Sequence, residues 1–325
     1  MRIFALKGST DLGVGIVAEM GRELDPHEER EFEEGEHKAR PLVSVRGQHV
    51  FVIHSLAGAG AGSVNDRLCR LLFFLACCRD NGAASVTAVV PYLAYSRKDR
   101  QTKSRDPVTT GYVAELVEAM GADCVVTLDV HNLAAFQNAF RCRTVHLDAR
   151  HLFVSEIERL ARNRPVVIFS PDGGGVKRAQ LLKESYEART GHEAGFGFMD
   201  KRRSRGVVSG DLFAGEVAGK AVFIVDDMIA SGGTMLRAAR ACRERGATAV
   251  CALATHGLFG PGVGEFFHSS AIDRVVVTDS VSSATAKDVD SGRRLDIISV
   301  APLLAETIGR LHRGESISSL TGIED

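Results

Sequence analysis

The segment 222–234 constrains the fold of this chain more than any other. The apolar run Val222–Val225 predicts a buried strand, and Asp226 and Asp227 follow at its carboxyl end. The turn Ser231–Thr234 then opens a helix. In an open α/β sheet, ligands bind beyond the carboxyl ends of the strands. Because glycines let the backbone approach an anion and a helix start adds N–H groups and a positive dipole end, the segment predicts a phosphate-binding turn. The neighbouring carboxylates suit sugar hydroxyls or a metal.

Strand and helix patterns alternate along the whole chain, which favours parallel sheets. The stretch 50–90 repeats the order strand, loop, helix, Gly-Ala turn, strand that is found in 222–254. A chance likeness between two ordinary strand–helix units is the alternative explanation. At 325 residues the chain is long enough for two domains with separate cores. We therefore expect an α/β fold of two similar domains, each a mainly parallel sheet flanked by helices.

We expect the domain boundary near Asp148, giving domains 1–148 and 149–325. The last helix, 302–312, is expected to pack back on the N-terminal domain. The stretch Glu23–Lys38 is dense in charge and is expected to be a solvated face or loop, with Phe32 as a lone aromatic residue among acids.

The composition argues against several kinds of partner. A net charge of −1 gives no support to a nucleic-acid or membrane-surface partner. We see no signal peptide and no apolar run of the roughly 18 residues that a spanning helix needs. The seven cysteines form no CxxC pair, which favours reduced thiols and a cytoplasmic location over a disulfide or metal site.

A second constellation follows the strand that ends near Pro91. The loop Tyr95–Arg105 is strongly basic, and its cations suit a triphosphate, with Arg97 able to donate bidentate hydrogen bonds. Taken alone, such a run is more often a solvated face. The phosphate turn, taken alone, fits either a nucleobase phosphoribosyltransferase or a phosphoribosyl diphosphate synthetase.

Several ordered motifs resemble the ribose-phosphate pyrophosphokinase (phosphoribosyl diphosphate synthetase) family, which has a type I phosphoribosyltransferase-like fold. The loop Pro91–Arg100 is similar to the Pro-Tyr-x-x-Tyr-x-Arg-Gln-Asp-Arg of that family. Further similar stretches are Glu33–Glu36 after Phe32, Val45–Ile53, Thr127–His131, Ser170–Arg178, Asp200–Arg203, Ser299–Glu306 and Gly314–Ser319.

The resemblance implies transfer of the diphosphoryl group of ATP to the 1-hydroxyl of ribose 5-phosphate, with Mg²⁺ as cofactor. It also implies a homo-oligomer whose nucleotide sites borrow residues from a neighbouring subunit. The implied nucleotide-binding residues are Phe32, Glu34, Gly35, Glu36, Arg97, Lys98, Asp99, Arg100 and His131. The implied ribose 5-phosphate residues are Asp226, Asp227, Ala230, Ser231, Gly232, Gly233 and Thr234. His131 and Asp172 are the implied metal contacts, and Lys201 and Arg203, at the start of a flap over 204–210, are the implied catalytic residues.

The chain departs from the family pattern at four places. Ala230 stands where the family usually has Asp, Glu34 where it has Asp, and Lys98 where it has Gln. The segment Asn132–Phe140 is one residue longer than its counterpart and different in character. The loss of the acid at Ala230 leaves open a non-catalytic regulatory or binding homologue of such a synthetase. A nucleobase phosphoribosyltransferase is a further alternative, but it has no use for the basic loop or for Phe32.

Overall fold

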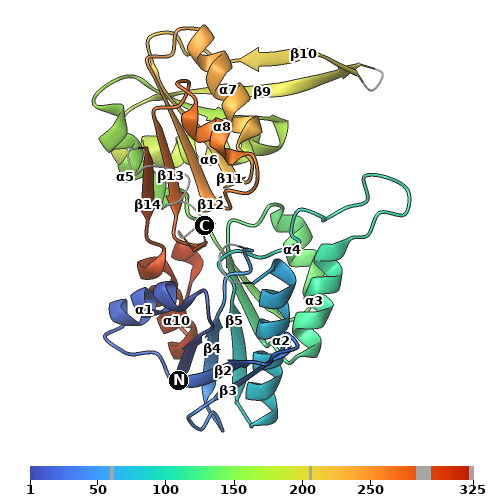
Figure 1. Cartoon of the computed structure of the whole chain (residues 1–325). Coiled ribbons are helices and arrows are strands. Elements are labelled where there is room, and N and C mark those ends of the chain that lie inside the picture. The colour runs from blue at the N-terminus through green and yellow to red at the C-terminus, as the bar shows by residue number, and fades with distance from the viewer. Residues whose placement is uncertain (59–61, 205–206, 283–293, 322–325) are drawn as a thin grey trace. The chain divides into compact units, whose positions relative to one another are not determined.

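A computed structural model describes residues 1–58, 62–204, 207–282 and 294–321, with the backbone alone for the parts of 201–211 within these ranges. The chain divides into two compact units (Figure 1). The N-terminal unit comprises Met1–Asp148, Ser280–Ser282 and the chain from Ser299 onward. The C-terminal unit comprises Ala149–Asp279 and the strand Leu295–Ile298.

The N-terminal unit is built on a five-stranded parallel sheet with the order β1-β4-β5-β6-β7. Its strands are β1 (Arg2–Ala5), β4 (His49–Ile53), β5 (Ser85–Val89), β6 (Cys124–Leu128) and β7 (Arg143–Leu147). Its helices are α1 (Thr10–Glu19), α2 (Val64–Asp80), α3 (Thr109–Ala119), α4 (Leu133–Ala139) and α10 (Ala301–Arg313), followed by the 3₁₀ turn η2 (Ser318–Leu320). The helix α10 packs against α1.

Local sequence explains where α2 begins and which face it buries. The Ser63 side chain accepts a hydrogen bond from the Asp66 backbone, and the Asp66 side chain accepts one from the Ser63 backbone, which together form a capping box. Apolar residues spaced three and four apart, Leu68, Leu71, Leu72 and Leu75, are buried. The helix is thereby anchored against β4 and β5.

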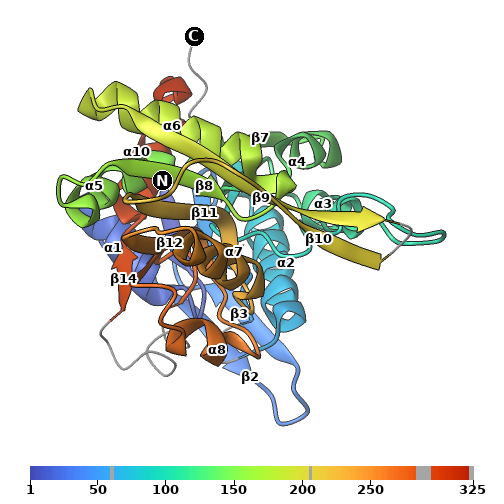
Figure 2. The ribbon, with the colours of Figure 1, turned by 90° about the horizontal axis from the view of Figure 1, so that it is seen from above.

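The C-terminal unit is built on a seven-stranded sheet with the order β10-β9-β8-β11-β12-β13-β14. Every neighbouring pair is parallel except β9 and β10, which are antiparallel. The strands are β8 (Val166–Ser170), β9 (Ala194–Ser204), β10 (Val207–Ala214), β11 (Ala221–Ile229), β12 (Ala249–Gly257), β13 (Arg274–Thr278) and β14 (Leu295–Ile298). The helices α5 (Arg150–Ala161) and α6 (Val176–Thr190) cover one face of the sheet, and α7 (Gly233–Glu244) and α8 (Val263–His268) cover the other (Figure 2).

The two units share one chain order, as the internal repeat predicts. The sheet β1-β4-β5-β6-β7 corresponds to β8-β11-β12-β13-β14, and in each unit an antiparallel strand pair comes between the first and second of these strands. The predicted fold of two similar domains with mainly parallel sheets is therefore confirmed. The near-continuous apolar strands, which are buried along most of their length, are typical of parallel sheets covered on both faces.

The stretch Glu23–Lys38 is a solvated face, as expected, since residues 30–36 are exposed, but it is not a loop, because it contains the hairpin of β2 (His27–Glu31) and β3 (His37–Pro41). The many charged residues give no apolar alternation that would indicate a strand, although β3 alternates between half-buried and exposed residues. Arg40 forms an ion pair across the hairpin with Glu28 at 2.6 Å. The hairpin packs on α2, where the His37 ring stacks on Phe73 at 5.4 Å. Among the described residues, every helix is too short or too polar to span a bilayer.

Candidate functional site

The strand β11 runs further than the apolar pattern predicts. It continues to Ile229, so Asp226 and Asp227 lie within the strand and not after it, and Asp226 is paired in register with Ala254 of β12. The Ile229 carbonyl accepts hydrogen bonds from the backbone N–H groups of Leu258 and Phe259, both at 3.0 Å. The end of the strand is therefore held by the chain that follows β12, and this contact positions the turn Ser231–Thr234, the phosphate turn predicted from the sequence.

The turn that follows requires glycine at one position. Gly232 has φ +76°, and a Cβ atom there would lie 2.5 Å from Cγ of Phe266. It caps α7, which begins at Gly233 and buries Met235, Leu236, Ala238, Ala239 and Cys242 in the core. Because the helix is anchored, its first N–H groups stay fixed toward the turn, which is a geometry suited to an anion.

The acid pair is held by a cation that the sequence analysis did not single out. Arg178, from the third position of α6, donates from Nη1 to Asp226 Oδ1 at 3.1 Å and lies 3.7 Å from Asp227 Oδ1. Burial and the adjacent Asp227 carboxyl raise the pKa of Asp226, and the Arg178 guanidinium opposes this shift. Arg178 is the last residue of the motif Ser170–Arg178, and its place in that motif is the sequence signal that marks it as a site residue.

We predict that Asp226 contributes a loss of unfolding free energy as the pH rises from about 4, where an unfolded aspartate loses its proton, to about 8, the raised pKa of the folded carboxyl. In this range the folded carboxyl keeps a proton that the unfolded one has released, so each step up in pH favours the unfolded state. Asp226→Asn lacks this contribution, so the unfolding free energy of the wild type, relative to that of the variant, should fall across the range. Urea unfolding at a series of pH values measures both slopes, and equal slopes would mean that Asp226 titrates normally.

The turn after β8 places Asp172 beside the same strand end. The Asp172 Oδ1 atom accepts hydrogen bonds from Gly174 N at 2.9 Å and Gly175 N at 3.1 Å, and so caps the 3₁₀ turn η1 (Gly173–Gly175) before α6. A Cβ on Gly175 would lie 2.7 Å from Ser170 Oγ. The carboxylate is therefore fixed by backbone donors and is half-buried.

Lys201 and Arg203 lie on β9, within the antiparallel ribbon that β9 forms with β10 (Figure 1). Lys201 is in register with Asp211, and Arg203 with Val208. The side chains of both cations lie outside what the structure describes. Of the predicted flap over 204–210, the backbone of Ser204 and of 207–210 belongs to the ribbon, and residues 205–206 lie outside the described residues.

In the N-terminal unit the basic loop leaves β5 and returns to α3. Arg97 and Arg100 are exposed, whereas Lys98 and Asp99 are half-buried. The exposed His131 follows β6, and the next residue, Asn132, donates from Nδ2 to Asp99 Oδ2 at 2.6 Å. The fold therefore brings the predicted nucleotide loop and the chain around His131 together.

The altered segment after His131 forms the short helix α4. Asn132 caps it by accepting a hydrogen bond from Ala135 N at 3.1 Å. Phe136 and Phe140 are buried, with ring centroids 5.2 Å apart. The segment is thus an amphipathic helix whose first turn is joined to the basic loop through Asn132.

The tip of the β2–β3 hairpin carries the remaining predicted nucleotide residues. Phe32 is 39% exposed, with the Arg30 guanidinium 5.1 Å from its ring centroid. Gly35 turns the chain with φ +88°, and Phe32 N donates to Glu36 O at 2.8 Å. Glu34 and Glu36 are exposed at the same tip. Figure 1 shows the hairpin apart from the loop before α3, so the N-terminal unit does not bring these two groups of residues together.

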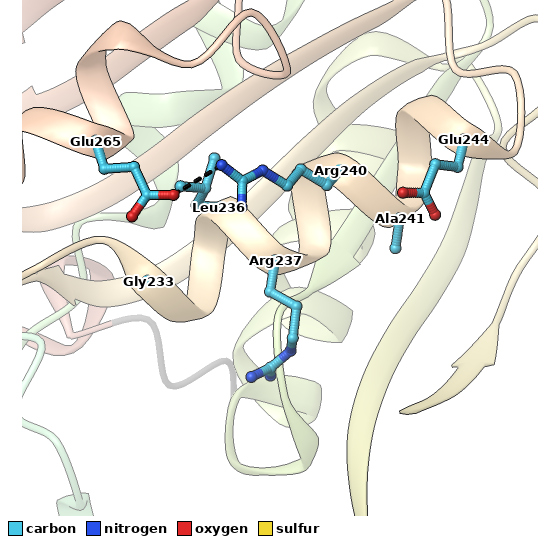
Figure 3. Close-up of a pocket in the computed structure, with 7 residues that line it drawn as sticks. All are labelled: Gly233, Leu236, Arg237, Arg240, Ala241, Glu244 and Glu265. Atoms are coloured by element: carbon cyan, nitrogen blue, oxygen red, sulfur yellow. Dashed lines mark hydrogen bonds and ion pairs between the residues drawn. The ribbon is translucent and has the colours of Figure 1, made fainter. Parts of the chain in front are cut away.

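A pocket of about 330 Å³ lies along α7 and reaches Gly233 of the phosphate turn (Figure 3). Its lining is Gly233, Leu236, Arg237, Arg240, Ala241, Glu244 and Glu265. Arg240 pairs with Glu265 of α8 at 2.8 Å, and Arg237 points away from that pair. The lining carries two cations and two anions, and no sequence motif marked it.

Comparisons with known proteins agree with this geometry. Residues 1–121 match the family model for the N-terminal domain of ribose phosphate pyrophosphokinase, and residues 211–321 match the phosphoribosyl synthetase-associated domain. The chain is 35% identical to the ribose-phosphate pyrophosphokinase of Listeria ivanovii, covering 98% of this chain and 96% of that one. Identity to the protein of the same name from Caldanaerobacter subterraneus is 36%, covering 98% and 97%.

A solved structure leads to the same family. The crystal structure of phosphoribosylpyrophosphate synthetase from Mycobacterium smegmatis matches this chain with a TM-score of 0.86 and 29% sequence identity, covering 96% of this chain and 99% of that one. Both of the family's domains are matched, and relatives of this identity cover nearly the full length. The chain therefore belongs to the ribose-phosphate pyrophosphokinase family.

Proposed function

We propose that this enzyme transfers the β,γ-diphosphoryl group of ATP to ribose 5-phosphate. The O1 hydroxyl loses its proton to solvent and O1 forms a bond to the β-phosphorus, while the bond from that phosphorus to the α,β-bridging oxygen breaks and AMP leaves. The products are phosphoribosyl diphosphate and AMP. The observation that carries the proposal is the phosphate turn after Asp226 and Asp227, with Gly232 in the left-handed region, in a chain similar over its length to named pyrophosphokinases.

The proposed roles follow from the chemistry of each group. The turn Ser231–Thr234 binds the 5-phosphate through backbone N–H groups, and the acid pair held by Arg178 accepts hydrogen bonds from the ribose hydroxyls. Phosphoryl-type transfer depends on positioning and on neutralising the charge of the transferred oxygens. Lys201 and Arg203 are proposed to neutralise the charge of the transferred oxygens. Arg97 and Arg100 are proposed to bind the triphosphate of ATP.

The donor set suits Mg²⁺. Asp172 offers a half-buried carboxylate fixed by two backbone N–H groups, and Asp226 and Asp227 are further oxygen donors. No group of three or more His, Cys, Asp or Glu side chains that could hold a metal occurs in the described part of the chain. Mg²⁺ in nucleotide-using enzymes is generally bound by one or two carboxylates together with substrate phosphates and water. We assign His131 and Asp172 each as a contact to Mg²⁺, which, when bound, would neutralise charge on the phosphates.

The test is AMP release from ATP, separated chromatographically, with ribose 5-phosphate and Mg²⁺ each present or omitted. The proposal expects AMP only when both are present. Ribose 5-phosphate binding without AMP from any nucleoside triphosphate would point to the non-catalytic homologue that Ala230 leaves open. Consumption of phosphoribosyl diphosphate with a free base would point to a nucleobase phosphoribosyltransferase.

A further inference from the structure

The four residues Arg97–Arg100 are of two kinds. The outer two, Arg97 and Arg100, are exposed. The inner two, Lys98 and Asp99, are half-buried, and each has its charged group bonded to another part of the N-terminal unit. All four residues carry charge, but in the folded protein only the outer two are exposed and can reach a triphosphate from solvent.

Lys98 is bonded to Asp106 across the loop. Its Nζ atom donates to Asp106 Oδ2 at 2.5 Å and to Thr102 Oγ1 at 3.3 Å. The same Oδ2 atom accepts from Thr102 N, Thr102 Oγ1 and Lys103 N at 3.2, 2.8 and 3.0 Å. One carboxylate oxygen thus collects four donors, and these hydrogen bonds lower the pKa of Asp106.

The base of the loop is fixed as well. The Oγ1 atom of the buried Thr110 of α3 lies 3.0 and 3.1 Å from the carbonyl oxygens of Tyr95 and Lys98, which share its one hydroxyl hydrogen. Tyr95 has φ +63°, and its hydroxyl donates to Asn65 of α2. Together with the hydrogen bond between Asn132 and Asp99, these contacts hold the backbone of Arg97–Arg100 from α2, α3 and the start of α4.

We propose that Lys98 and Asp106 are positioning residues, which hold the loop in the shape that presents Arg97 and Arg100 to the triphosphate of ATP. The Lys98 ammonium acts on Asp106 and not on the nucleotide. The inference rests on the proposed function, because it assumes that this loop binds ATP. Its physical basis is preorganisation: a loop already ordered loses less conformational freedom when the ligand binds.

The substitution Asp106→Asn separates this role from direct phosphate binding by Lys98. If Lys98 bound phosphate, removing Asp106 would release the ammonium and add positive potential, and ATP would bind equally well or more tightly. If the pair shapes the loop, losing it weakens ATP binding. The two readings predict effects of opposite sign.

We expect Asp106→Asn and Lys98→Met each to raise KM for ATP roughly three- to tenfold, the scale of a partly exposed ion pair, with kcat nearly unchanged. The double variant should have no higher a KM for ATP than the single variants, because both substitutions remove the same interaction. Lys98→Arg should keep the wild-type KM. Arg79→Gln is the matched control: it removes an ion pair to Asp123 of the same length, 2.5 Å, elsewhere in the unit and should leave KM unchanged.

The dissociation constant of the α,β-methylene analogue of ATP, measured by calorimetry on the same variants, separates failure of this inference from failure of the proposed function. Wild-type protein that neither binds the analogue nor releases AMP would contradict the proposed function. Wild-type binding with unchanged or tighter binding by Asp106→Asn would overturn the positioning role. Melting temperatures close to that of the wild type would establish that the variants are folded.

Discussion

Replacing Lys201 by alanine is expected to lower the rate constant for AMP formation by roughly 10²–10³, the cost of removing one preorganised charge donor from a transferring group. The KM for ribose 5-phosphate should change little, because its proposed contacts lie in the turn after β11. Single-turnover kinetics with saturating substrates measures the effect on the chemical step without product release.

Arg202→Ala is the matched control for this prediction. It removes one positive charge from the same run of β9, Asp200–Arg203, so it changes the net charge of the ribbon equally. A loss of similar size in Arg202→Ala would assign the effect to the general potential of the ribbon. An unchanged rate in Lys201→Ala would contradict the role assigned to Lys201.

The substitution Gly232→Ala is expected to cost roughly 2–4 kcal/mol of unfolding free energy, combining left-handed backbone strain with overpacking. The φ of +76° is unfavourable for any residue with a Cβ atom, and that atom would lie 2.5 Å from Cγ of Phe266. Ribose 5-phosphate binding should be lost with it, because relieving the contact displaces the start of α7. Urea unfolding and isothermal calorimetry with ribose 5-phosphate measure the two effects.

The neighbouring glycine provides the control. At Gly233 a Cβ atom would meet only Ser231 Oγ at 3.8 Å, and the position is the first residue of α7. Gly233→Ala should therefore keep or slightly raise the unfolding free energy, since alanine favours a helix over glycine by up to about 1 kcal/mol. If both variants lost stability equally, the special requirement at Gly232 would be wrong.

The sequence predicts the parts of this fold that depend on local apolar patterns. The buried strands Val50–Ile53 and Val222–Val225 show continuous apolar runs, and the repeat between 50–90 and 222–254 predicts the two similar domains that the sheets confirm. The hairpin β2–β3 is not predicted, because its half-buried positions are filled by histidine, glutamate, alanine and proline, without the large apolar residues that mark a strand, and their burial depends on α2. No local pattern contains that contact.

The candidate site is predictable in its residue types but not in its partners. The turn at Gly232 and the acid pair follow from the sequence, whereas the contact of Arg178 with Asp226 joins residues 48 apart and needs the adjacent strands β8 and β11. Asp106 lies only eight residues from Lys98, yet a basic loop with two acids, Asp99 and Asp106, gives no sign that the second carboxylate accepts hydrogen bonds from four donors. Such partners depend on loop geometry.

The most direct test of the central claim follows the two outer phosphates of ATP separately. ATP labelled with ³²P at the β position, and in a parallel reaction at the γ position, is incubated with the enzyme, ribose 5-phosphate and Mg²⁺. If an intact diphosphoryl group is transferred, the label appears in phosphoribosyl diphosphate in both reactions and in equal amounts. AMP stays unlabelled in both. Labelled ADP from the β-labelled ATP, with the γ label alone on the sugar or in free phosphate, would contradict the account.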